Sequence, residues 1–226
     1  MFLRFDRLNL IKFRLVLSVV LAFLIAANPS LADPQQPKPL RQGELTQLLK
    51  KGGHVLIIRH ERTEVPSRED DYSRPSDDCR AQRNLSIAGL AGAQETGVVL
   101  DAVGIPVERV ISSPMCRSAE TARLMFGVEY ETDFRLLHHD PKGERNMDMA
   151  ESEMRELLAE IAPGIPNANI ALIGHSATIR RVSGLWLSEG EIGVLKLNEQ
   201  GEIAALGQFM GSDLAPLARL NLSSRE

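Results

Sequence analysis

Three short, largely apolar runs separated by helical patterns restrict this chain to a small set of folds. They cover residues 55–58, 109–112 and 169–173. Runs of this length and composition are typical of buried strands. Strands that alternate with helices favour a sheet with much parallel pairing and helices on both faces. The sequence therefore predicts an α/β fold of three layers, with helices on either side of a mostly parallel central sheet.

The stretches between these runs carry the spacing of amphipathic helices. Expected helices cover residues 43–50, 86–103, 115–126, about 154–161, and a segment from Ser176 in which Ile179, Val182 and Trp186 share one face. Ser86 is placed to cap the second helix, and Pro163 to end the fourth. Residues 193–197 and 202–206 predict a β-hairpin. The polar, proline-containing segment 64–84 predicts a long surface loop.

The first 32 residues have the pattern of an export signal. Its basic residues, which precede an apolar run, are Arg4, Arg7, Lys12 and Arg14. The apolar run covers residues 15–27, shorter than the roughly 20 residues of a membrane helix, and small residues follow at Ser30 and Ala32. We expect cleavage after Ala32, a flexible leader at 33–42, and one domain at 43–226 that is periplasmic or secreted. The alternative is an uncleaved signal that anchors the domain in the membrane.

Charge and cysteine content argue against several classes of function. The formal net charge is −4, which provides no basic surface for nucleic acid. Two cysteines are too few for a disulfide scaffold or a four-ligand zinc site, and the histidines lack partners at metal-ligand spacing. We therefore expect no nucleic-acid partner, no metal and no cofactor.

Polar residues follow each of the three expected strands. Arg59 and His60 follow the first strand, Ser112 and Ser113 stand at the end of the second, and His175 follows the third. In open α/β sheets, ligands bind outside the carboxyl ends of the strands. We therefore expect these residues to share a single site.

Arginine and histidine together suit phosphoryl transfer. The guanidinium groups of Arg59 and Arg117 match phosphate oxygens and stay charged at every relevant pH. Arg117 falls in the first turn of its expected helix, where free backbone N–H groups also favour an anion. A neutral imidazole, on His60 or His175, is a nucleophile. Because the arginines supply positive charge, this chemistry needs no metal.

Four sequence blocks in this order surround these residues. They are Arg59-His60-x-x-Thr63, Asn84-Leu85-Ser86-x-x-Gly89, Ser112-Ser113-Pro114-x-x-Arg117-x-x-Glu120-Thr121-Ala122 and Ile173-Gly174-His175-Ser176. Together they resemble the histidine phosphatase superfamily, which includes the cofactor-dependent phosphoglycerate mutases. The resemblance implies a phosphoglycerate mutase-like fold in one small domain without a large cap insertion. It also implies hydrolysis of phosphomonoesters.

Carried over residue by residue, the resemblance assigns roles to the expected site. His60 becomes the nucleophile that forms phosphohistidine, and water then hydrolyses that intermediate. Arg59, Arg117 and His175 become the set that binds the phosphoryl group, named the phosphoryl clamp below. Thr63 would orient the turn after the first strand.

Two departures from the family concern charge and proton transfer. Glycine is common after the nucleophile, but this sequence has Glu61, whose carboxylate would repel phosphate unless it points away or pairs with an arginine. Arg62 is either a further phosphate contact that offsets this charge or a solvated loop residue. Many monoesterases also carry a glutamate as general acid, and His138 stands nearest to its expected position. His138 or Asp140 would serve as the acid if they are not ordinary loop residues, or the substrate has a good leaving group.

An exported histidine phosphatase is expected to act on a phosphorylated small molecule or an envelope glycolipid. One alternative is a protein phosphohistidine phosphatase, because small members without a carboxylate acid do that work, although export argues against it. The other alternative is a non-catalytic phosphate-binding module, which would have no use for the nucleophile.

Cys79 and Cys116 both lie in segments expected to surround the site. Two nearby thiols pair in an oxidising compartment. We therefore expect a disulfide that joins the loop 64–84 to the helix carrying Arg117. Two separate free thiols are the alternative.

Overall fold

The computed structural model describes most of the chain from Arg41 onward. The described residues are 41–65, 69–127, 129–140, 143, 145–163, 168–198 and 201–223. They belong to a compact unit that begins at Pro37. The expected signal segment 1–32 and nearly all of the leader 33–42 lie outside them. No described helix has both the length and the apolar composition needed to cross a membrane.

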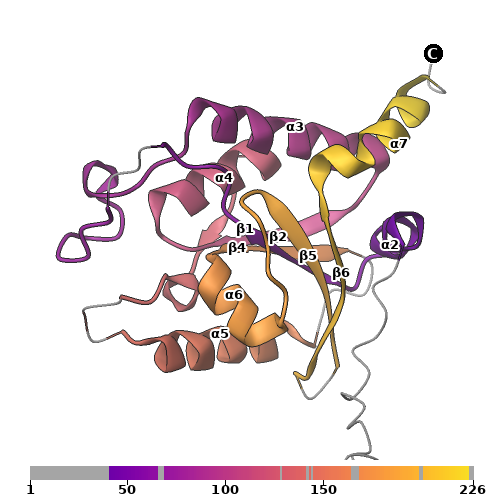
Figure 1. Ribbon diagram of the computed structural model, residues 1–226. Coiled ribbons are helices and arrows are strands. Elements are labelled where there is room, and N and C mark those ends of the chain that lie inside the picture. The colour runs from indigo at the N-terminus through magenta and orange to yellow at the C-terminus, as the bar shows by residue number, and fades with distance from the viewer. Residues whose placement is uncertain are drawn as a thin grey trace, which may run out of the picture. The chain divides into compact units, whose positions relative to one another are not determined.

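Six strands of the described chain form one mixed sheet in the order β3-β2-β4-β1-β5-β6 (Figure 1). Their bounds are β1 Val55–Arg59, β2 Val107–Ser112, β3 Glu131–Thr132, β4 Asn169–Gly174, β5 Glu191–Leu197 and β6 Ile203–Met210. The first four strands in this order run parallel, whereas β5 and β6 join by antiparallel pairing. The predictions of a mostly parallel sheet and of a hairpin near its end are confirmed.

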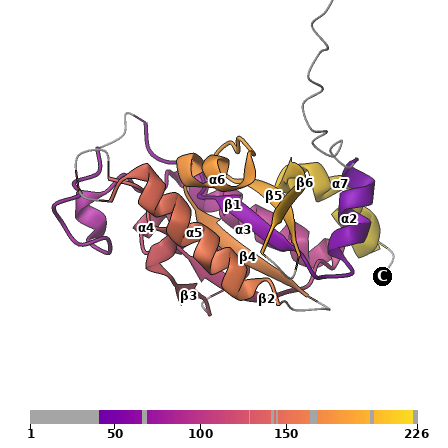
Figure 2. The same cartoon turned by 90° about the horizontal axis from the view of Figure 1, so that it is seen from below.

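Helices cover both faces of this sheet. They are α2 Gln42–Leu49, α3 Ile87–Val103, α4 Cys116–Phe126, α5 Met147–Ile161, α6 Ser176–Ser183 and α7 Gly211–Ser223, with 3₁₀ turns at Cys79–Ala81 and Phe134–Leu136. Helices α3, α4 and α7 lie on one face, and α5 and α6 lie on the other (Figures 1 and 2). This is the three-layer arrangement that the sequence predicts.

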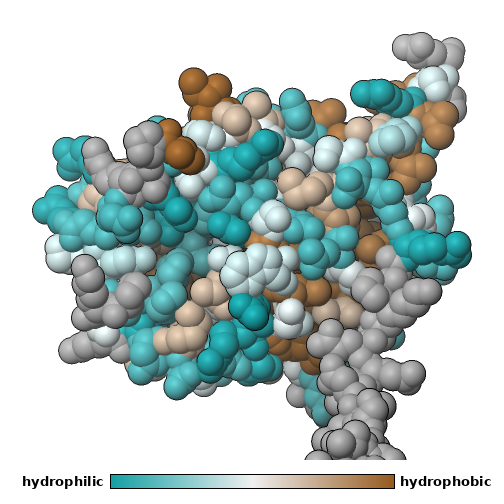
Figure 3. All heavy atoms as spheres, viewed as in Figure 1, coloured by the Kyte–Doolittle hydropathy of each residue, from teal (hydrophilic) through white to brown (hydrophobic). Residues whose placement is uncertain are grey.

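The central strand β1 shows why both layers of helices are needed. Leu56 and Ile58 pack into a cluster of buried side chains with α3, α4 and α7, while Val55 and Ile57 pack into another with α5 and α6. Successive strand residues point to opposite faces, so a strand that is apolar at every position must be covered on both sides. The face of the molecule in Figure 3 is accordingly mostly hydrophilic, with apolar atoms in scattered groups.

The end of α6 differs from the prediction. Ile179 and Val182 are buried on its inner face, but Trp186 lies beyond the end of the helix with its side chain exposed. The helix ends because Gly184 adopts a left-handed conformation, with φ +75°. The guanidinium of Arg180 then covers the Trp186 ring, 4.7 Å from its centroid. The prediction that Trp186 shares the inner face of α6 is therefore wrong.

Helix starts follow local capping. The Ser86 hydroxyl accepts a hydrogen bond from the N–H of Gly89 and caps α3, as predicted. Helix α5 begins earlier than predicted because Asn146 caps it through the N–H of Met149. Helix α7 and the two-residue strand β3 have no counterpart in the prediction. Pro216 inside α7 interrupts the usual helical signal, and β3 is too short to leave one.

Candidate active site

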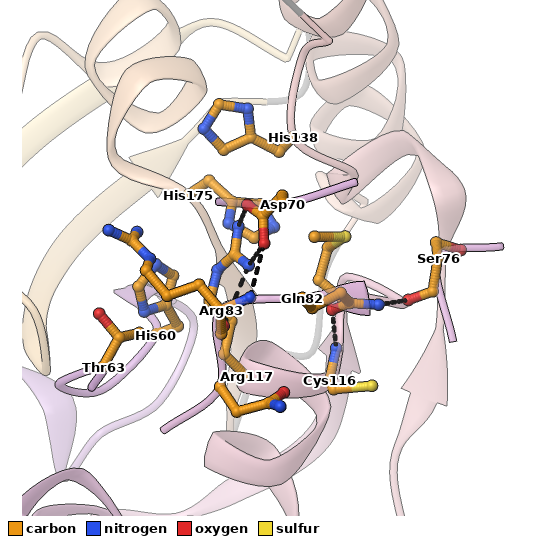
Figure 4. Close-up of polar contacts among 12 residues, drawn as sticks. His60, Thr63, Asp70, Ser76, Gln82, Arg83, Cys116, Arg117, His138 and His175 are labelled. Atoms are coloured by element: carbon orange, nitrogen blue, oxygen red, sulfur yellow. Dashed lines mark hydrogen bonds and ion pairs between the residues drawn. The ribbon is translucent and has the colours of Figure 1, made fainter. Parts of the chain in front are cut away.

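The carboxyl ends of β1, β2 and β4 bring the predicted residues into one cluster. Arg59 ends β1 and His60 follows it, Ser113 follows β2, and His175 follows β4 immediately before α6. Arg117 reaches the same place from the first turn of α4. The ring centroids of His60 and His175 lie 5.5 Å apart, and Figure 4 shows both rings beside Arg117. Of the predicted site residues, these four and Ser113 are thus together.

His60 is buried and held as a neutral imidazole. Its Nδ1 lies 2.8 Å from the carbonyl oxygen of Glu61. A carbonyl can only accept, so Nδ1 carries the proton and Nε2 keeps its lone pair. Burial, followed by the positive charges of Arg117 and Arg59, holds the pKa of His60 well below its ordinary value of 6.5. His60 therefore has the form of a nucleophile at neutral pH.

His175 is oriented by the residues that follow β2. Its Nε2 lies 3.0 Å from the hydroxyl oxygen of Ser113, which also accepts the N–H of Met115 at 3.4 Å. The Ser113 hydroxyl can donate to Nε2, and in that arrangement the proton of the ring lies on Nδ1. Burial, followed by the charge of Arg117, holds the pKa of His175 well below its ordinary value. His175 is therefore neutral, and with the proton on Nδ1 it is a hydrogen-bond donor in this site.

Arg117 is a buried, fixed charge. Its exposed fraction is 1%, and its two terminal nitrogens bind the carboxylate of Asp70 at 3.0 and 3.1 Å. Its Nη1 also approaches the carbonyl oxygen of Arg83 at 3.4 Å. Glu120, the alternative partner on the same helix, pairs with Arg123 instead. Arg117 is therefore part of the site and not of a surface ion pair on α4.

Arg59 is oriented by the segment that follows α6. Its Nη1 donates to the carbonyl oxygen of Leu187 at 3.1 Å, and its Nη2 lies 3.6 Å from the carboxylate of Glu189. The same carboxylate accepts a hydrogen bond from the Thr63 hydroxyl at 3.0 Å. Glu189 thus ties the clamp arginine to the turn after β1, and it gives Thr63 the orienting contact that the resemblance implies.

Glu61 does not place its charge among the histidines. Its buried carboxylate lies against Gly92 of α3 and against Gly190, where an added Cβ would collide with it. Burial raises the pKa of Glu61. The backbone N–H of Arg62 donates to this carboxylate at 3.1 Å, and its Nε lies 3.7 Å away. Both residues line a cavity of about 590 Å³ beside α3 and α7.

The side chain of Arg62 lies apart from the histidine cluster, and its phosphate contact stays a prediction. The side chain of Arg62 is directed to Glu61 and is 55% exposed. This contact fits the expectation that Arg62 offsets the charge of Glu61, and the exposure of the side chain fits the alternative of a solvated loop residue. Arg62 takes this direction because the chain turns after His60, and the side chains of Glu61 and Arg62 leave the site on the side of α3.

The residues considered as general acids lie after the 3₁₀ turn at Phe134–Leu136. The ring of His138 lies 5.1 Å from that of His175 and stacks on His139. Its Nδ1 donates to the carbonyl oxygen of His139 at 2.6 Å, and burial lowers its pKa to about 4. At neutral pH its other ring nitrogen therefore holds no proton to give. Asp140 faces His139 instead: burial lowers the pKa of His139, and the negative charge of the Asp140 carboxylate opposes that lowering.

Arg83 is a site residue that the sequence analysis missed. Figure 4 shows its side chain extended toward His60, and its charge adds to burial and to the two clamp arginines in lowering the pKa of His60. Its neighbour Gln82 fixes this stretch of the loop, because the amide oxygen accepts the N–H of Cys116 at 3.0 Å. The one sequence feature that could have indicated Arg83 is its position directly before the block that begins at Asn84.

The structure pairs Cys79 with Cys116 in a disulfide. Cys116 is the first residue of α4, and Arg117 is the second. The disulfide therefore joins the loop that carries Arg83 to the helix that carries the buried clamp arginine.

Removal of this disulfide is expected to destabilise the domain. The two cysteines are 37 residues apart, and on the chain-entropy model closure of such a loop contributes about 3–4 kcal/mol. Denaturant unfolding of the Cys79→Ser/Cys116→Ser protein should show this loss relative to the oxidised protein. Reduced wild-type protein is the control, since it lacks the bond but keeps both residues. Two titratable thiols in unreduced, denatured protein would contradict the pairing.

Four donor groups of this cluster can bind an oxyanion. Among the described residues, the Nε atoms of Arg59, Arg83 and Arg117 and the Nδ1 of His175 are buried without a hydrogen-bond partner. Buried donors normally have a partner, and these four carry or adjoin positive charge. In the same described part of the chain, no group of three metal-ligating side chains is close enough to hold a metal ion.

The comparisons with known proteins concern the fold. The sequence matches no protein-family model and no curated protein. The structure is similar to that of the protein histidine phosphatase SixA in complex with tungstate, with a TM-score of 0.51 and 18% identity over 71% of this chain and 99% of SixA. For a mycobacterial glucosyl-3-phosphoglycerate phosphatase the TM-score is 0.51 and the identity 18%, over 69% of this chain and 95% of that protein. For the alpha-ribazole phosphatase from Shigella flexneri the TM-score is 0.52 and the identity 16%, over 67% of this chain and 94% of that protein.

These similarities confirm the predicted phosphoglycerate mutase-like fold. Each of the three phosphatases is matched over nearly its whole length.

Proposed function

We propose that this protein is a histidine phosphatase, which hydrolyses phosphomonoesters through a covalent phosphohistidine on His60. The observation that carries the proposal is the state of His60, a buried neutral imidazole whose Nδ1 is engaged and whose Nε2 keeps its lone pair. The phosphoryl clamp around it supports the same function, and so does the similarity in fold to known phosphatases.

Binding of the phosphoryl group uses the donors that have no other partner. The guanidinium groups of Arg59, Arg83 and Arg117 and the Nδ1–H of His175 surround its oxygens. Arg59 is already oriented by Leu187 and Glu189, Arg117 by Asp70, and His175 by Ser113. Little reorganisation is needed when charge develops on the transferring group, which is the condition for electrostatic stabilisation of a transition state.

The chemistry takes two displacements at phosphorus. In the first, the lone pair of His60 Nε2 forms a P–N bond as the P–O bond to the leaving group breaks, and that bond's electrons leave with the oxygen. In the second, water attacks phosphorus, the P–N bond breaks, and its electrons return to Nε2. The protons of the attacking water leave with inorganic phosphate and solvent, so His60 is restored as neutral imidazole.

The state of His138 bears on the substrate class. With a pKa of about 4 and its Nδ1–H engaged, His138 is a poor proton donor at neutral pH. A substrate with a good leaving group needs no general acid. This favours activated esters such as aryl phosphates over simple alkyl phosphates. It also favours the second candidate function, phosphohistidine hydrolysis, in which an imidazole leaves.

The proposed location is the cell envelope or the exterior. The pattern of residues 1–32 supports export, and the disulfide between Cys79 and Cys116 supports an oxidising compartment. In that setting the proposed substrates are phosphorylated small molecules or envelope glycolipids. Cytosolic phosphorelay proteins would not meet the enzyme there.

The test is a panel of phosphorylated compounds assayed with the mature protein. The panel includes an aryl phosphate, sugar phosphates, a phosphorylated glycolipid and a phosphohistidine peptide, with His60→Ala as the blank. Release of phosphate above that blank supports the proposal. Binding of phosphate without release from any compound would indicate a phosphate-binding module.

Activity is expected to be independent of divalent metal ions. The arginines of the clamp neutralise the phosphoryl oxygens, so neither of the two displacements at phosphorus uses a metal. A chelator should therefore leave the rate of aryl phosphate hydrolysis unchanged, while vanadate and excess inorganic phosphate should inhibit it. Loss of activity in chelator that magnesium or zinc restores would point to a metallophosphatase.

A further inference from the structure

Asp70 places a carboxylate in a site that otherwise attracts anions. Its two oxygens accept hydrogen bonds from the terminal nitrogens of Arg117, at 3.0 and 3.1 Å (Figure 4). The exposed fractions of the two side chains are 11% and 1%. A negative charge so close to a bound phosphate repels it, so the presence of Asp70 requires a compensating role.

The protein holds Asp70 in this position. The backbone N–H of Arg83 donates to its Oδ1 at 2.9 Å. The N–H of the next residue, Asp71, donates to the carbonyl oxygen of Ala81 at 2.8 Å. The chain between these residues contains Cys79, which the disulfide fixes to α4. Asp70 therefore belongs to the same anchored loop segment that presents Arg83.

Asp70 leaves one edge of the Arg117 guanidinium available. A guanidinium can bind two oxygens along its Nη1/Nη2 edge or along its Nε/Nη2 edge. Asp70 takes the first edge. The Nε of Arg117 is buried and has no hydrogen-bond partner among the described residues. An oxyanion can thus bind the second edge while Asp70 remains where it is.

We propose that Asp70 is a positioning residue, which holds Arg117 by its Nη1/Nη2 edge so that the Nε edge faces the phosphoryl group. This rests on the proposed function, because it assigns the Nε edge to the substrate. The opposite role is competition, in which Asp70 imitates phosphate and the substrate must displace it. The two roles predict opposite changes in anion affinity when the carboxylate is removed.

The first test compares Asp70→Asn with Asp77→Asn. Asp77 is exposed in the same loop, so the control removes the same charge without touching Arg117. Asp70→Asn should bind vanadate about tenfold more weakly and lose about 100-fold in kcat/KM for an aryl phosphate, with most of the loss in kcat. Asp77→Asn should match wild type, and Asp70→Glu should recover part of the loss.

The pH profile separates positioning from a merely structural role. Without the carboxylate, the charge of Arg117 is no longer offset, and this lowers the pKa of His60 further. The acid limb of kcat/KM should therefore move to lower pH in Asp70→Asn. An unchanged acid limb would mean that Asp70 does not act through Arg117.

Hydrogen exchange in the wild-type protein gives a measurement that does not depend on any variant folding. Vanadate should leave exchange at the amide of Arg83 as slow as in the free protein, because that N–H stays bonded to Asp70. Faster exchange there, or tighter vanadate binding by Asp70→Asn, would establish competition and overturn the proposal. Equal vanadate affinity of wild type and Asp70→Asn would also overturn it. Vanadate binding to neither protein would contradict the proposed function itself.

Discussion

Replacing His60 with alanine is expected to abolish turnover while phosphate binding survives. The variant lacks the lone pair that forms the P–N bond, and no other group of the cluster is placed to replace it. The expected loss in kcat is on the order of 10⁴-fold or more. Vanadate should still bind, because Arg59, Arg117 and His175 keep their own supports. Steady-state assays with an aryl phosphate and a direct binding measurement check both statements.

The matched control is His54→Ala. His54 stands immediately before β1, at the opposite end of the strand from His60. The same substitution there removes an imidazole without reaching the site, so turnover should stay near that of the wild type. Near-normal turnover by His60→Ala would overturn the mechanism, whatever the turnover of His54→Ala.

Trapping the intermediate identifies the nucleophile directly. Enzyme mixed with labelled substrate and quenched should carry phosphate on His60, in a linkage that is labile to acid and stable to base. The label should be missing from His60→Ala. A label on a serine or an aspartate would assign the nucleophile elsewhere.

The pKa of His60 sets the pH range of this activity. Attack requires the neutral ring, and burial with the charges of Arg117 and Arg59 holds the pKa well below 6.5. Lowering the pH through 6.5 should therefore leave most of the nucleophile deprotonated and active. The acid limb of kcat/KM should appear only at distinctly lower pH.

Residues that end strands could be placed from the sequence. The run Leu56-Ile57-Ile58 is apolar at every position, which predicts a strand buried on both faces, and Arg59 and His60 follow it at the carboxyl end. The same reasoning places His175 after β4. Parallel strands bring their carboxyl ends to one edge of the sheet, so the topology alone gathers these groups.

Residues on irregular segments could not be placed in this way. Arg83, Asp70 and Glu189 act in the site through loops, where no periodicity relates sequence position to direction. Their partners lie far along the chain, as in the contact of Glu189 with Thr63 across 126 positions. Arg62 shows the converse, because it is close to His60 in sequence while its side chain lies against Glu61 and beside α3.

His175→Ala is expected to slow the chemical step more than it weakens binding. The Nδ1–H of His175 should strengthen its hydrogen bond as negative charge grows on the transferring group, so its loss is felt most in the transition state. Removal of one such donor costs about 10²–10³-fold in kcat. Vanadate imitates the transition state and should lose affinity more than inorganic phosphate does. Single-turnover rates and the two inhibition constants check these expectations.

The control for this variant is His139→Ala, which removes a neighbouring imidazole that stacks on His138. A small loss of kcat in His139→Ala, together with a large loss in His175→Ala, would assign the effect to the ring that Ser113 orients. Ser113→Ala then separates orientation from donation, since it keeps the His175 ring but removes its partner at 3.0 Å. It should lower kcat by less than His175→Ala. Equal loss of phosphate and vanadate affinity in His175→Ala, with kcat unchanged, would reduce His175 to a binding group.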